Sequence, residues 1–256
     1  MDTKSLRQKI LDLAIRGKLV PQDPNDEPAS VLLERIRTEK QQMVKDGKLK
    51  AKDIRGDFVI FKGEDNLHYE KMADGTVKCI EDEVPFEVPD SWEWSRLSAL
   101  GTFAGGKTPS TANCNFWGGD VLWVTSKDMK TKYIDDTLIK MSDVGFKQMQ
   151  LFPPDSLLMV VRSGILRWTF PLAILKAQAT VNQDIKVCSL YLHFMAEYIY
   201  NYLKASELGI LTHCSKSGTT VESLNVEDIK NLLIALPPFS EQSRIDDAIS
   251  LVLLYN

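Results

Sequence analysis

The residues best suited to chemistry are small polar side chains gathered around two glycine pairs between positions 105 and 127. This stretch begins Gly105-Gly106-Lys107-Thr108-Pro109-Ser110, passes through Gly118-Gly119 and ends at Thr125-Ser126-Lys127. Glycine lets a backbone approach a partner closely or adopt positive φ, and hydroxyl groups both donate and accept hydrogen bonds. With a lysine at each end, such a loop on a strand could read a nucleic acid. The alternative is an ordinary loop and hairpin.

Polar side chains in later loops extend this candidate surface. Base readout in DNA typically uses Arg or Lys for guanine and Asn or Gln for adenine, and half or more of the contacts go to phosphate and sugar. We nominate these side chains for DNA contact: Lys107, Thr108, Ser110, Ser126, Lys127, Arg162, Ser163, Arg167, Asn182, Gln183, Lys216 and Ser217. For Asn182 and Gln183 the alternative is that their amides satisfy buried backbone groups between strands.

Two enzymatic interpretations compete with DNA reading. Pro154-Asp155 followed by Asp184-Ile185-Lys186 matches the Pro-Asp…Asp-x-Lys skeleton of metal-dependent nucleases, whose carboxylates hold Mg²⁺ while the lysine orients a water. The second half of that pattern also occurs at 46–48, 128–130 and 228–230, so it is unspecific. Leu236-Pro237-Pro238-Phe239 is similar to an amino-methyltransferase motif, but a leucine cannot accept a hydrogen bond from the target amine. We expect no catalytic residue and no metal site.

The segments around these residues predict a mixed α/β domain with helices at both ends. In chain order we expect helices over 3–17 and 28–47, a strand at 58–61, a hairpin at Asp74-Gly75, strands over 92–97, 155–162, 170–175 and 179–188, an aromatic helical stripe over 191–202, a strand at 232–236 and a helix capped by Ser240. Trp92 and Trp94 are expected on one side of their strand, in the core.

The composition is that of an ordinary soluble globular protein, with 44% hydrophobic and 26% charged residues among 256. Four cysteines without a Cys-x-x-Cys pair indicate reduced thiols in a cytoplasmic protein, and no apolar run is long enough to cross a bilayer. The formal net charge is −4, and residues 101–236 hold 13 Lys and Arg against 12 Asp and Glu. Since DNA-binding domains are usually basic, the basic side chains must share one face, or a partner must contribute phosphate contacts.

The loop at 105–126 closely resembles the opening of a target recognition domain in the specificity subunits of Type I restriction–modification systems. The resemblance covers most of the chain in the family's order, through the segments 6–22, 23–36, 68–71, 74–76, 92–94, 179–186 and 236–245. It implies a DNA-reading subunit without its own catalysis, which holds two methyltransferase (M) subunits on double-stranded DNA and which a restriction (R) subunit can join. No cofactor is then expected in this chain, because S-adenosylmethionine belongs to the methyltransferase, and ATP and Mg²⁺ to the nuclease–translocase.

The same resemblance implies an order of domains. We expect a helical segment over 1–50, a linker and hairpin over 51–90, a recognition domain over 91–238 and the start of a spacer helix over 239–256. Whole family members carry a second recognition domain beyond the spacer, whereas this chain ends after about four turns of helix. We therefore expect a half-length subunit that reads one half-site, as a homodimer or with a second half-length specificity chain. A scaffold that has lost DNA binding is a further alternative, favoured by the near-neutral charge.

Overall fold

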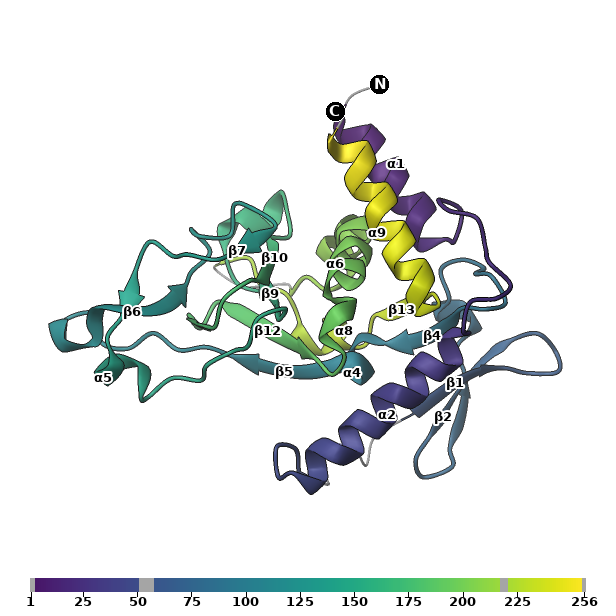
Figure 1. Cartoon of the computed structure of the whole chain (residues 1–256), viewed down its shortest axis with the longest axis horizontal. Helices are drawn as coiled ribbons and strands as arrows, with labels where there is room; N and C mark the ends of the chain where they lie inside the picture. Colours follow the sequence, from purple (N-terminus) through teal and green to yellow (C-terminus); the bar gives the residue numbers. More distant parts are fainter. Residues whose placement is uncertain (1–2, 51–57, 217–220, 255–256) are drawn as a thin grey trace. The chain divides into compact units, whose positions relative to one another are not determined.

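The chain folds into two compact units, which the computed structural model describes over residues 3–50, 58–216 and 221–254. The terminal unit combines the two ends of the chain, Met1–Leu100 and Asn231–Asn256, and the central unit is formed by Gly101–Lys230 (Figure 1). In the sequence, the central unit is thus inserted between two segments of the terminal unit. The linker residues 51–57 lie outside the described residues.

The terminal unit consists of helices and two small sheets. Its helices are α1 (Thr3–Ile15), α2 (Ala29–Lys45), α4 (Leu97–Leu100) and α9 (Phe239–Leu254), with a 3₁₀ turn η1 (Glu81–Glu83). An antiparallel sheet contains β1 (Phe58–Lys62), β2 (His68–Met72) and β3 (Val77–Cys79), and a second pairs β4 (Glu93–Arg96) with β13 (Leu233–Leu236). The helices predicted near the N-terminus, the hairpin, and the strands at 58–61, 92–97 and 232–236 are confirmed. Trp92 and Trp94 are both buried.

The recognition domain predicted over 91–238 extends beyond the central unit at both ends. Strand β4 pairs antiparallel with β13, so that Trp94 lies opposite Ala235, and Leu97 N donates to Leu232 O at 3.0 Å. These backbone bonds place both strands in the terminal unit. The partner of a strand is set by contacts between distant parts of the chain, and local sequence patterns do not reveal it.

Buried polar contacts fasten the two chain ends to each other within the terminal unit. The Glu241 carboxylate of α9 is fully buried and accepts hydrogen bonds from Trp92 Nε1 at 2.9 Å and from Gln22 Nε2 at 2.5 Å. Burial raises the pKa of Glu241 in spite of these bonds. Arg244 of the same helix pairs with Asp26 at 2.5 Å, and α1 lies beside α9 (Figure 1).

The central unit is a mixed α/β fold built on two sheets. The larger sheet has the strand order β5-β12-β9-β10-β7, and the smaller one the order β11-β6-β8. The strands are β5 (Gly101–Gly105), β6 (Trp117–Val124), β7 (Tyr133–Ile134), β8 (Lys140–Met141), β9 (Leu157–Val160), β10 (Leu172–Leu175), β11 (Ala179–Val181) and β12 (Ile185–Leu190). The helical elements are η2 (Cys114–Phe116), α5 (Asp143–Phe146), η3 (Gly164–Arg167), η4 (His193–Met195), α6 (Ala196–Ala205), α7 (Glu207–His213) and α8 (Val226–Lys230).

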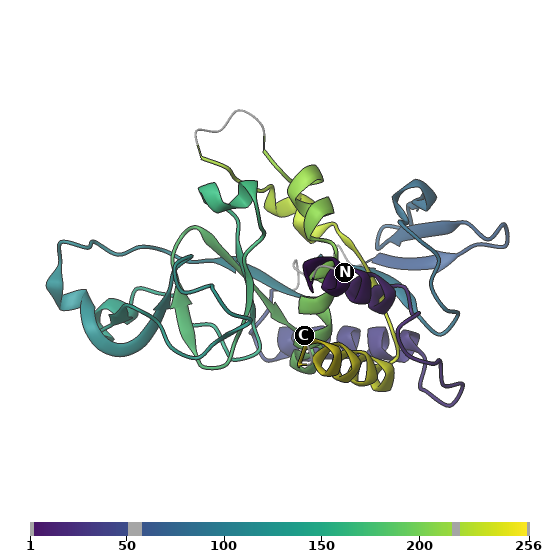
Figure 2. The same cartoon turned by 90° about the horizontal axis from the view of Figure 1, so that it is seen from above.

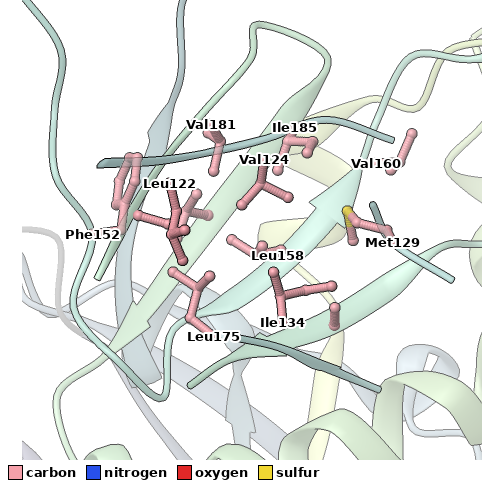
Figure 3. Close-up of a cluster of buried hydrophobic side chains, with 13 residues drawn as sticks. Leu122, Val124, Met129, Ile134, Phe152, Leu158, Val160, Leu175, Val181 and Ile185 are labelled. Carbon is pink, nitrogen blue, oxygen red and sulfur yellow. The ribbon is translucent and has the colours of Figure 1, made fainter. Parts of the chain in front are cut away.

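One hydrophobic core joins the two sheets of the central unit (Figure 3). Leu158 and Val160 of β9 share it with Leu122 and Val124 of β6. Because neighbouring side chains of a strand point to opposite faces, Leu157 and Met159 belong to the other face, and they are buried as well. Helix α6 packs against β10. Burial on both faces explains the unbroken apolar run at 157–160.

Three details of the expected secondary structure are corrected by the structure. The strand predicted over 179–188 is two strands in different sheets, because Asn182 Oδ1 accepts a hydrogen bond from Asp184 N at 3.1 Å and turns the chain. Helix α9 begins at Phe239, so Ser240 lies inside the helix. Phe194 lies in η4 and is 41% exposed, whereas most of the aromatic stripe, including Tyr198 and Tyr202, is buried core as predicted.

A close backbone contact positions the loop that follows β5. Lys107 N donates to Val181 O at 3.1 Å, and Trp123 Nε1 donates to Lys107 O at 3.2 Å. A Cβ added to Gly106 would lie only 1.8 Å from the Val181 carbonyl oxygen. Glycine is therefore required at 106, because any side chain would push the loop away from β11.

A second anchor holds the segment that follows η3. The Glu207 carboxylate accepts hydrogen bonds from Thr169 Oγ1 at 2.6 Å and from Phe170 N at 2.5 Å, and it pairs with Lys204 Nζ at 2.7 Å. Burial alone would raise the pKa of Glu207. The hydrogen bonds from Lys204, Thr169 and the Phe170 backbone outweigh burial and hold its pKa below the ordinary value of 4.5.

We predict that Gly106→Ala destabilises the chain and displaces the 105–110 loop, since the added methyl group overlaps a backbone oxygen. The expected loss in the free energy of unfolding is about 1–3 kcal/mol, as for other overpacking substitutions. Gly164→Ala is the matched control, because no atom would lie within 4 Å of the new Cβ. Urea denaturation of both variants tests this, and equal stability of the two would contradict the close contact.

We predict that Glu207→Gln lowers the free energy of unfolding at pH 7 by about 1–3 kcal/mol, because it removes a charged acceptor from three donors. A carboxyl with a lowered folded pKa stabilises the fold above its unfolded pKa and loses that contribution as the pH falls through the folded pKa. The difference between wild type and variant should therefore shrink as the pH falls below about 4.5. Urea midpoints at pH 7 and pH 4 measure it, with the exposed Glu227→Gln as control. A difference that does not change with pH would refute the assignment.

Candidate nucleic-acid interface

Five strands of the central unit bring their ends to one edge. β6 and β11 are parallel, with Val124 opposite Val181, so the loops after both strands emerge together. β12 starts where β9 ends, with Ile185 opposite Val160, and Lys186 lies opposite Gly105 at the end of β5. Because strand register places these ends side by side, loops far apart in the sequence meet here. We call this surface the loop edge: residues 106–108, 125–127, 162–167, 182–184, 215–216 and 222–224.

The first half of the loop edge surrounds the turn between β11 and β12. The exposed Lys107 follows Gly106 onto this turn, and Thr108 Oγ1 donates a hydrogen bond to Gln183 Oε1. Asn182 N donates to Val124 O at 3.0 Å, just before Ser126 and the exposed Lys127. The predicted loops at 107, 126 and 182 are therefore neighbours in the structure.

The second half of the loop edge continues from the same turn to η3. Val161 N donates to Asp184 O at 2.9 Å, and Arg162 Nε lies 3.9 Å from Asp184 Oδ1. Ser163 Oγ caps η3, accepting a hydrogen bond from Ile165 N at 3.5 Å. Arg162 and the turn at 182–184 thus share one continuous surface.

The segments 215–216 and 222–224, yellow-green in Figure 2, are joined to this surface by backbone hydrogen bonds. Ser163 N donates to Glu222 O at 3.0 Å, and Arg162 forms a β-bridge with Ser223. Lys216 N in turn donates to Ser223 O at 2.9 Å. The structure therefore connects Lys107, Arg162 and Lys216 through an unbroken series of contacts across the loop edge.

Two predicted residues fit the interface less directly, and one is not described. Asn182 is buried, and its side chain bonds to Asp184 N, which agrees with the alternative that it satisfies the backbone. Ser110 lies further along its loop, where its carbonyl oxygen accepts a hydrogen bond from Trp117 Nε1 at 3.3 Å. Ser217 lies outside the described residues.

Acidic partners hold the two arginines of the loop edge. Arg167 Nε donates to Glu222 Oε1 at 2.7 Å, and Arg162 lies near Asp184. Both arginine side chains are more than 60% exposed, and ion pairs this exposed contribute about 0–1 kcal/mol. Such pairs orient the arginines, yet cost little to exchange for a phosphate or a guanine edge. This arrangement explains how a unit with nearly equal numbers of acids and bases can present cations outward.

The carboxylates of the nuclease alternative lie at opposite ends of the β9–β12 pair. Asp184 precedes Ile185, which lies opposite Val160, whereas Asp155 precedes the start of β9 at Leu157. Asp184 faces Val161, and at about 3.3 Å per residue the stretch from Leu157 to Val161 alone spans roughly 13 Å along the strand. Asp155 instead pairs with Lys176 at 3.4 Å. The two carboxylates do not form a shared metal site. Among the described residues, no three His, Cys, Asp or Glu side chains are grouped to hold a metal ion.

Sequence patterns did not identify Glu222, which lies in the loop edge, or Trp168, which directly follows the loop-edge segment 162–167 in the chain. Glu222 and Asp184 are the acidic partners of the arginines, and their pairing is visible only in three dimensions. Trp168 follows Arg167 and is 83% exposed. The available signal was the run Arg162 to Trp168, where an aromatic residue directly follows a basic one. Its exposure could not be read from the sequence.

Known proteins of one family resemble this chain over much of its length. The description "Type I restriction modification DNA specificity domain" belongs to a family model that matches residues 89–253. The specificity subunit of EcoR124I/EcoR124II from Escherichia coli is 33% identical over 156 residues, which are 60% of this chain and 39% of that protein. The EcoEI specificity subunit, also from E. coli, is 46% identical over 99 residues, or 39% of this chain and 13% of that protein.

The solved structure of the HsdS subunit from Thermoanaerobacter tengcongensis is similar to this chain, with a TM-score of 0.47 at 16% identity. The similarity covers 89% of this chain and 50% of that one. The chain thus spans half or less of the length of each of these relatives. No helix within the described parts of the chain is long and apolar enough to cross a bilayer. With well over half of its length matched by the family model, the chain belongs to the Type I restriction–modification DNA specificity family.

Proposed function

We propose that this chain chooses the DNA sequence on which a Type I restriction–modification complex acts, reading one half-site with the loop edge of its central unit. The chain supplies recognition, and the chemistry belongs to its partners. It needs no cofactor of its own, while S-adenosylmethionine is bound by the methyltransferase and ATP with Mg²⁺ by the restriction subunit. The proposal fits the family to which the chain belongs.

The observation that carries the proposal is the gathering of exposed cations at one edge of the central unit. Lys107, Lys127, Arg162, Arg167 and Lys216 are all exposed and come from loops that adjoin one another. Lysine and arginine at such an edge can neutralise phosphates, whereas arginine and Gln183 can reach base edges in a groove. Loops held by strands also keep their side chains in a defined geometry, which sequence reading requires.

Methyltransferase subunits dock, in this proposal, on the helices of the terminal unit. Support comes from α9, which packs beside α1 and whose buried Glu241 binds Gln22 and Trp92, so that the helices form a firm platform. If the chain acts as a half-length subunit, two copies related by two-fold symmetry would read a palindromic interrupted site. A mixed pair with another specificity chain would read two different half-sites.

The scaffold alternative predicts a different response to salt. The central unit owes its near-neutral charge to acids such as Asp184 and Glu222 as well as to its bases. If the chain only joins protein partners, DNA binding by the reconstituted complex should not depend on the cations of the loop edge. If the chain reads DNA, log Kobs falls linearly with log[salt], and removal of one phosphate contact lowers the slope by about 1.

We predict that Arg162→Ala and Lys107→Ala relax or abolish sequence choice by the complex of this chain with its methyltransferase. Each substitution should weaken binding by about 1–3 kcal/mol, while S-adenosylmethionine binding by the methyltransferase stays intact. Sequencing of the methylated positions in a randomised DNA pool measures the choice. Lys176→Ala is the control. Lys176 follows the end of β10 that lies beside the start of β9, away from the loop edge, and it pairs with Glu197. Equal methylation of unrelated DNAs by the wild-type complex would end the proposal.

We predict that Glu222→Gln tightens DNA binding roughly two- to fivefold, an effect the size of one exposed charge pair. The change removes a negative charge from the loop edge. It also releases Arg167, whose Nε donates to the Glu222 carboxylate at 2.7 Å in the wild-type chain. Fluorescence anisotropy with a labelled duplex at fixed ionic strength measures the change. Glu227→Gln, which removes the same charge from a pair within α8, should leave the affinity unaltered. Weaker binding by Glu222→Gln would show that the Arg167 pair is needed in the bound state.

A further inference from the structure

Trp168 is the most exposed large hydrophobic side chain in the described part of the chain, at 83%. It follows the short turn η3, which also exposes Ile165 at 43%. Single exposed hydrophobic residues are common on protein surfaces and by themselves indicate nothing. The case for Trp168 therefore depends on how the turn is built and on what surrounds it.

The turn under Trp168 is firmly anchored on both sides. Leu166, two residues before it, is buried, and Phe170, two residues after it, is fully buried. Trp168 N donates to Ile165 O at 2.9 Å, and Leu166 N donates to Ser163 O at 3.1 Å. Glu207 binds the next two residues. The indole is thus presented by a backbone with little freedom to fold it back onto the protein.

The surroundings of Trp168 indicate which partner it contacts. Arg162 and Arg167 belong to the same turn region, and Lys216 is joined to it through Ser223. A large exposed aromatic side chain on a turn that also carries exposed cations is poorly suited to a hydrophobic protein surface, because burial would strip water from the charges. It is well suited to nucleic acid, whose phosphates pair with the cations while its bases stack on the ring.

We propose that Trp168 is a wedge that packs against, and partly unstacks, a base step of the duplex that the loop edge contacts. Apolar side chains inserted between base steps kink DNA and let it contact more protein surface. This inference rests on the proposed function. It adds a contact that carries no charge and that favours sequences which unstack easily, such as pyrimidine–purine steps.

The test uses the chain with its methyltransferase partner and the duplex that this complex selects from a randomised pool. Trp168→Ala should weaken binding roughly 5- to 150-fold, the range for one aromatic–base stack. The slope of log Kobs against log[salt] should not change, because no phosphate contact is lost, whereas Lys127→Ala, which removes a cation that can neutralise a phosphate, should lower it by about 1. Trp168→Phe should restore much of the affinity.

A spectroscopic signal separates a wedge from a merely structural role. 2-Aminopurine placed singly along the selected duplex should brighten at one step with wild type and stay quenched with Trp168→Ala. A mismatch at that step should strengthen wild-type binding and leave the variant unaffected, because the mismatch already supplies the unstacking. The matched control is Phe194→Ala, an exposed aromatic residue after the far end of β12.

The outcomes are distinguishable. Unchanged affinity and no 2-aminopurine signal for Trp168→Ala, alongside loss of binding for Arg162→Ala, would overturn the wedge and leave the proposed function standing. Absence of any selected duplex with the wild-type complex would overturn both. An equal loss of affinity in Phe194→Ala would trace the effect to packing and refute the wedge.

Discussion

The packing of the Gly106 backbone on the Val181 carbonyl oxygen is the constraint on which the loop edge depends. It leaves no room for a Cβ, and it brings the loop after β5 onto the turn between β11 and β12. The same turn is held by Val124 on one side and by Val161 on the other. Three segments that are far apart in the sequence therefore converge on residues 181–184. A loosened contact at this point would separate the exposed cations from one another.

The electrostatic design of the central unit follows from this convergence. Cations gathered at one edge repel each other, and two acids, Asp184 and Glu222, lie among them. Exposed pairs of this kind are weak, so they limit the repulsion without blocking a stronger anionic partner. The near-neutral total charge of the central unit has a second effect, because it reduces binding to arbitrary DNA through charge alone. Discrimination then depends on contacts that require the right sequence.

Much of the fold could be predicted from the sequence, because it follows from local patterns. The N-terminal helices, the hairpin at Asp74-Gly75 and the apolar strand at 157–160 are each encoded by neighbouring residues. The sequence did not separate β11 from β12, since the break comes from a hydrogen bond between Asn182 and Asp184 that competes with a long run of strand-forming residues. The pairing of β4 with β13 could not be predicted from local patterns either, because it joins strands that are separated in the sequence by the whole central unit.

The residues of the candidate site, too, could be predicted only where residue type alone was informative. Residue type was enough to nominate Lys107, Arg162 and Lys216, and the structure brings their loops together. Residue type was not enough for Asn182, whose side-chain amide oxygen accepts a hydrogen bond from the backbone of Asp184. It was not enough for Trp168 either, because a tryptophan is usually expected in the core and this one is exposed. Exposure depends on which neighbours cover a side chain, and those neighbours come from elsewhere in the chain.

The insertion of residues 101–230 between β4 and β13 affects how the central unit could be exchanged between related genes. The entry and exit of this block adjoin paired strands, where Leu97 N donates to Leu232 O, so its two joints lie next to each other. The strand pairing and the buried Glu241 contacts of the terminal unit involve no residue of this block. A single exchange of gene fragments can thus replace the whole block as a cassette, and the recipient need not evolve a new framework to accept it.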